Sequence, residues 1–141
     1  MVYAFMAKHA KQTNTPEDWR ILAERDMSVA DYLAATMRPL PAEIIAFHCQ
    51  QAVEKYLKGA LVILEEEPPY IHDLMQLCKL AEKHRPSFIG ISSLCSIITQ
   101  FSGQPRYDRG LSLSEADIGT VLNHTKTIKN FLQNEIPELF S

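Results

Sequence analysis

The chain has 141 residues, 46% of them hydrophobic, which is the length and composition of one globular domain with an ordinary core. Its net charge of −3 lacks the strong positive charge of general nucleic-acid-binding proteins, so we do not expect nucleic acid as a partner. No apolar run approaches the ~18 residues of a membrane span, and no signal peptide is recognisable, so we expect a cytoplasmic protein without a membrane partner.

The chain contains three cysteines, Cys49, Cys78 and Cys95, which are far apart and form no C-x-x-C pair. Such thiols are typically small buried groups in proteins of a reducing compartment. The spacing of the histidines, cysteines and acidic residues matches no zinc or iron site, so we expect no metal and no cofactor.

The first predicted helix runs from about Thr15 to Met37. Thr15 is a suitable N-cap, and Pro16 suits the first helical position. Pro39 and Pro41 end the helix. Its apolar residues recur at three- and four-residue steps: Trp19, Leu22, Ala23, Met27, Ala30, Leu33, Ala34 and Met37.

Four further helices are predicted along the chain. Three of them cover about 41–64, 72–84 and 86–101. The fifth begins after a polar loop at an N-cap, Ser114, with Asp117 three residues later as a weaker form of the capping box, and it ends before Pro137. No segment alternates between hairpin turns as a strand would. The sequence therefore predicts an all-α, up-and-down antiparallel bundle of four to five helices over 15–141, after an N-terminal extension at 1–14.

Polar residues share one face of the second predicted helix. His48, Gln51, Lys55 and Lys58 fall within an arc of about 80°, which the pattern places opposite the apolar stripe, and Glu54 can pair with Lys58 at i, i+4. Two lysines, an amide and an imidazole on one face can bind phosphates, or can cross a symmetric dimer interface. The alternative is a solvated helix face with one ion pair.

Two smaller groups of residues could also carry function. At the start of the third helix, Asp73 can cap the helix while His72 hydrogen-bonds to a neighbour; a metal site would need further ligands. In the long loop, Arg106 and Arg109 surround Tyr107. The loop could bind a phosphate or a carboxylate and stack on a base, or the arginines could simply hold the loop through pairs with Asp108. No Gly-rich phosphate loop, H-E-x-x-H or G-x-S-x-G motif occurs, so we predict no catalytic residue.

The string IAFHCQQAVEKYLKGAL at 45–61 resembles the central helix of the HEPN family, which is named for a proposed nucleotide-binding role. The resemblance extends to the first helix (Trp19, Ala23, Asp26 and Ala30), to His72-Asp73-Leu74 and to Arg106-Tyr107. It implies a bundle of four to five helices, typically a homodimer. Many members are encoded beside, or fused to, a minimal nucleotidyltransferase, and several such pairs are toxin–antitoxin modules. The polar positions that match are His48, Gln51, Glu54, Lys55, Lys58, His72, Asp73, Arg106 and Tyr107.

The chain departs from the family pattern at two points. Family members that cleave RNA carry an arginine followed after four to six residues by a histidine, and no arginine here has a histidine at that distance. Many relatives also read R-Y-P-D in the last loop, whereas Asp108 directly follows Tyr107 here. The first departure argues against a ribonuclease site of the family's usual kind.

Three hypotheses for the function follow. The first is a non-catalytic module that partners a nucleotidyltransferase and binds nucleotide or phosphate through six residues, supported by three more. The six are His48, Gln51, Lys55, Lys58, Arg106 and Tyr107, and the supporting residues are Glu54, His72 and Asp73. The second is a ribonuclease toxin with a non-standard site such as His48 or His72. The third is a purely structural dimerisation module.

Overall fold

The computed structural model describes residues 14–102 and 113–141, and within these ranges every regular element is a helix. The α-helices are α2 (Pro16–Thr36), α3 (Ala42–Ile63), α4 (Leu74–His84), α5 (Ser92–Ser102) and α6 (Glu115–Glu135), and the 3-10 helices are η1 (Pro86–Ile91) and η3 (Pro137–Phe140). The predicted all-α bundle is therefore confirmed. Of these helices, none combines the length and the apolar character that crossing a membrane would require.

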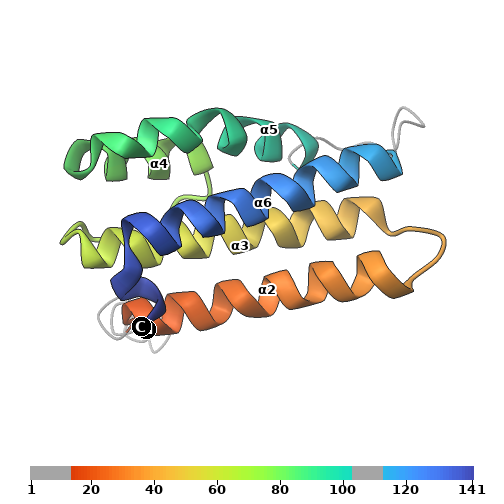
Figure 1. Ribbon diagram of the computed structural model, residues 1–141, viewed down its shortest axis with the longest axis horizontal. Coiled ribbons are helices and arrows are strands. Elements are labelled where there is room, and N and C mark those ends of the chain that lie inside the picture. Colours follow the sequence, from red (N-terminus) through yellow and green to blue (C-terminus); the bar gives the residue numbers. More distant parts are fainter. Residues whose placement is uncertain (1–13, 103–112) are drawn as a thin grey trace, which may run out of the picture.

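Helix α3 lies in the middle of the bundle, with α2 along one side and α4 and α5 on the opposite side (Figure 1). It packs against α2, α4, α5, α6 and η3. The antiparallel neighbour α2 is its most extensive contact. Large side chains from all layers meet in one core: Ile45, Tyr56, Leu57, Leu61, Leu74, Leu77, Phe88, Ile98, Ile128, Leu132, Ile136 and Leu139. A helix covered on so many sides has little surface left for solvent, and this shapes the site described below.

The predicted starts of the first and fifth helices are confirmed in detail. Thr15 and Asp18 form a complete capping box at α2, with Pro16 as its first residue. Ser114 and Asp117 form the same arrangement at α6. Each box satisfies backbone N–H groups that have no partner inside the helix. These local contacts fix where the two longest outer helices begin.

Two predicted helices differ in extent from the structure, although the predicted cap at Asp73 is confirmed. The fourth predicted helix is divided into η1 and α5, because after Pro86 the backbone first adopts the tighter 3-10 turn, in which the N–H of Ser92 donates to Ile89. The third begins at Leu74 rather than His72, because the Asp73 carboxylate accepts hydrogen bonds from the N–H groups of Met75 and Gln76 as the N-cap.

Helix α3 ends in a Schellman turn that reverses the chain. The N–H of Glu66 donates to the carbonyl of Leu61 at 2.9 Å, and the N–H of Glu65 donates to that of Val62 at 3.0 Å. Glu65 has a φ of 64°, in the left-handed region that favours glycine. The chain then runs back through Pro68, Pro69 and Tyr70 before α4 begins.

The three cysteines are free and buried, as predicted from their spacing. Cys49 lies on α3, Cys78 on α4 and Cys95 on α5. Burial raises the pKa of the Cys49 thiol to about 11. The thiol is therefore protonated at neutral pH and belongs to the core rather than to any reactive site.

Candidate functional site

The polar arc of α3 is partly buried, so the expectation that it lies opposite the apolar stripe was wrong for its C-terminal half. Lys58 is 5% exposed and Glu54 4%, whereas His48, Gln51 and Lys55 are half-buried. Helix α2 covers this part of the arc because Gly59 has no side chain. A Cβ atom at Gly59 would lie 3.0 Å from the Cβ of Trp19 and 2.8 Å from Leu139. The close approach places Trp19 of α2 beside Lys58.

A carboxylate from α2, Asp26, gathers two of the predicted site residues. Its Oδ1 lies 2.8 Å from Nδ1 of His48, and its Oδ2 accepts a hydrogen bond of 2.5 Å from Nζ of Lys55. Asp26 is itself only 9% exposed. It was not predicted as a site residue, although an acidic residue between Ala23 and Ala30 on the apolar stripe was a signal that could have revealed it.

A second carboxylate, that of Glu54, contacts two further predicted site residues. Its Oε2 accepts a hydrogen bond of 3.0 Å from Nζ of Lys58, which confirms the predicted i, i+4 pair, and lies 3.0 Å from Nδ1 of His72. The Lys58 ammonium also lies 5.6 Å from the centre of the Trp19 ring, a cation–π contact. The His72 side chain is 80% exposed, so its imidazole is anchored at Nδ1 while most of the ring faces solvent.

The remaining predicted site residues either make no side-chain hydrogen bond to Asp26 or Glu54 or lie outside the described residues. Gln51 donates to Gln50, and Gln50 in turn donates to the carbonyl of His72, so a pair of amides links α3 to the loop before α4. Asp73 caps α4 and makes no hydrogen bond to either of the two carboxylate clusters, which are Asp26 and Glu54 with the side chains that each of them holds. Arg106 and Tyr107 lie outside the described residues. The structure thus brings His48, Gln51, Lys55, Lys58, Glu54 and His72 to one seam along α3.

Comparison with known families identifies the chain. The family model of the HEPN domain matches residues 16–136, which is nearly the whole chain. The chain belongs to the HEPN family. Searches of curated proteins and of solved structures gave no match to this HEPN domain.

The charges along the seam of the HEPN domain balance. Asp26 and Glu54 contribute two negative charges, and Lys55 and Lys58 contribute two positive charges. Each ion pair is largely shielded from water, so loss of one partner would leave a buried charge without compensation. Within the described residues, no group of three or more histidine, cysteine and acidic side chains is arranged to hold a metal ion. The seam can therefore offer hydrogen-bond donors, but no excess of positive charge from its lysines.

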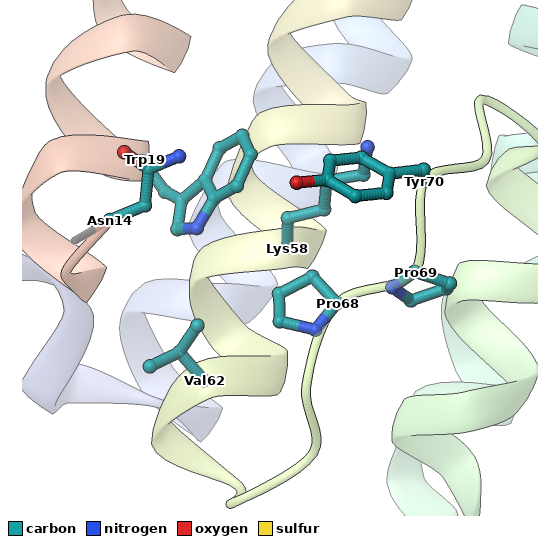
Figure 2. A pocket seen from close by; sticks show the side chains of 7 residues that line it. All are labelled: Asn14, Trp19, Lys58, Val62, Pro68, Pro69 and Tyr70. Carbon is teal, nitrogen blue, oxygen red and sulfur yellow. The ribbon is translucent and has the colours of Figure 1, made fainter. Parts of the chain in front are cut away.

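A small pocket opens where the seam meets the start of α2 (Figure 2). Its volume is about 80 Å³. The walls come from α2, from the end of α3 and from the loop that follows α3. They consist of Asn14, Trp19, Lys58, Val62, Pro68, Pro69 and Tyr70. Of these residues, sequence reasoning had assigned only Lys58 to a site.

Proposed function

We propose that this HEPN domain is a non-catalytic module that binds a nucleotide or phosphate compound along α3 and partners a minimal nucleotidyltransferase, in a system of the toxin–antitoxin type. The observation that carries the binding role is the seam, where two lysines and two imidazoles are each held by the carboxylate of a buried residue, Asp26 or Glu54. The nucleotidyltransferase partner and the toxin–antitoxin setting are what membership of the family suggests.

Lys55 is the residue best placed to meet a phosphate. An ammonium has three N–H donors, and among the described residues Lys55 uses one of them on Asp26. Its side chain is 23% exposed, so a ligand can reach the other two. His48 on the same carboxylate can add a further donor. Arg106 and Tyr107 remain predicted contributors to this site.

The test is calorimetric titration of the purified protein with ATP, GTP, CTP and inorganic triphosphate. We expect Lys55→Gln to weaken binding by about tenfold, which corresponds to about 1.4 kcal/mol. Lys126→Gln is the control for loss of a lysine that pairs with an α2 carboxylate, because Lys126 on α6 pairs with Asp31 at 3.3 Å, and with neither Asp26 nor Glu54. Absence of binding to the unmodified protein would contradict the proposal.

One observation favours a second function. His72 has the arrangement of a general base, with Nδ1 on a buried carboxylate and most of its ring exposed. This fits the ribonuclease alternative with a non-standard site. Cleavage of RNA by the purified protein, lost in His72→Ala and retained in His124→Ala, would favour that alternative over the binding module.

We also propose that the HEPN domain acts as a homodimer. Ile44 and Phe47 lie three residues apart on α3, and each is 51% exposed. The Phe47 ring meets the His48 ring edge to face, with the centroids 5.4 Å apart, so this apolar pair adjoins the seam. A second copy covering it would remove apolar surface from water beside the site.

A further inference from the structure

The pocket beside Lys58 has apolar walls and one nearly buried cation. Figure 2 shows the Trp19 ring to the left of Lys58, the Tyr70 ring across the outer end of the Lys58 side chain, and Pro68 below them. Val62 and Pro69 complete the apolar lining, and Asn14 adds an amide. Flat and ring-shaped side chains of this kind form stacking surfaces for a planar ligand.

The size of the pocket limits what can enter. Its volume of about 80 Å³ is well below the roughly 300–1,000 Å³ of pockets that enclose whole drug-sized ligands. A complete nucleotide would not fit inside. A single flat ring, or one ring of a fused base whose other ring stays in solvent, suits a pocket of this size.

The chemistry of Lys58 further limits the kinds of ring that the pocket can bind. Its side chain is 6% exposed, and among the described residues its Nζ donates one hydrogen bond, to Glu54. A hydrocarbon ring would leave the other N–H groups without acceptors, which is costly in a buried site. A phosphate at Lys58 would have to lose its water beside the nearly buried Glu54 carboxylate, whereas at Lys55, whose side chain is 23% exposed, a phosphate can stay partly hydrated. A heteroaromatic ring with keto or imine acceptors satisfies the donors without adding negative charge.

We propose that this pocket binds the base of a nucleotide, stacked on Trp19 and Tyr70 and hydrogen-bonded to Lys58, an inference that rests on the proposed nucleotide-binding function. The position of the pocket on α3 also sets the direction in which the bound nucleotide lies. Lys55 and His48 precede Lys58 by three and ten residues, or about 4.5 and 15 Å along the axis of α3. The phosphates therefore extend from the pocket toward Lys55 and His48.

The experiment uses the fluorescence of Trp19, because it is the only tryptophan in the chain. The protein is titrated with nucleosides, with nucleoside triphosphates and with inorganic triphosphate. We expect nucleosides and nucleotides to quench the fluorescence of Trp19. Tyr70→Ala should weaken the binding of nucleosides and nucleotides by about tenfold, because it removes a stacking surface for the base, and should leave the binding of inorganic triphosphate unaffected. The substitution should spare the core, since Tyr70 is 69% exposed.

Tyr32→Ala is the control, because Tyr32 is equally exposed, at 68%, but lies toward the other end of α2. Nucleotides and triphosphate that bind in calorimetry without any change in Trp19 fluorescence would overturn the base pocket and leave the phosphate site standing. Quenching by nucleosides without binding of triphosphate would support the pocket and contradict the phosphate site. Binding of no compound at all would overturn both.

Discussion

Glu54 holds the Lys58 and His72 half of the candidate site together. It is 4% exposed, and it contacts both the Lys58 ammonium and the His72 imidazole. Breaking one side of a buried ion pair costs more than the pair contributes, because the remaining charge stays buried without a partner. The same carboxylate therefore serves the fold and the orientation of the site.

We expect Glu54→Gln to lower the free energy of unfolding by about 3 kcal/mol, because the Lys58 ammonium would lose its counter-charge. Urea denaturation followed by circular dichroism measures the change. Glu43→Gln is the control: Glu43 is an exposed carboxylate on the same helix, and its loss should cost about 0.5 kcal/mol or less.

The double variant Glu54→Gln/Lys58→Met tests the cause of that loss. Removing both charges should restore most of the stability, since an apolar side chain of similar length replaces the unpaired ammonium. If the double variant were as unstable as the sum of the two single variants, the proposed coupling between Glu54 and Lys58 would be wrong.

Among the described residues, the two glycines that lie in α-helices have opposite effects on their helices. Gly59 sits where α2 and η3 meet α3, and any Cβ there would press on the Cβ of Trp19 and on Leu139. Gly119 is an exposed position of α6 with nothing within 4 Å of an added Cβ. Helix propensity alone would favour alanine at both positions.

We expect Gly59→Ala to lower the free energy of unfolding by about 1–2 kcal/mol, because the strain of overpacking exceeds the gain in propensity. Gly119→Ala should instead raise it by about 0.5–1 kcal/mol. Thermal and urea unfolding of both variants measure the difference. A stabilising Gly59→Ala would show that the contact between α2 and α3 yields easily.

The proposed dimer is a property of the whole molecule. We expect the protein to be dimeric at micromolar concentration by light scattering, and Phe47→Ser to shift it to monomer by removing apolar contact area. Ile89→Ser is the control, since Ile89 is also exposed, at 64%, but lies on η1. A monomeric unmodified protein would contradict the proposal.

The helices of the molecule could be predicted because their signals are local. Capping boxes such as Thr15 with Asp18, and apolar stripes, depend on residues a few positions apart. The partners of Asp26 lie 22 and 29 residues away, so the contact depends on how α2 sits against α3. Sequence periodicity shows which residues share a face of a helix, but it does not show how many neighbouring helices cover that face. The burial of Lys58 could therefore not be predicted.

The left-handed turn at Glu65 has a consequence for the geometry of the pocket. Its backbone sets the angle at which the chain leaves α3, and the two consecutive prolines that follow at 68–69 are stiff. The direction that the chain takes after position 65 therefore contributes to where Tyr70 lies. The spacing of the two aromatic walls therefore has two origins: the turn at Glu65 directs Tyr70, and the close approach at Gly59 positions Trp19.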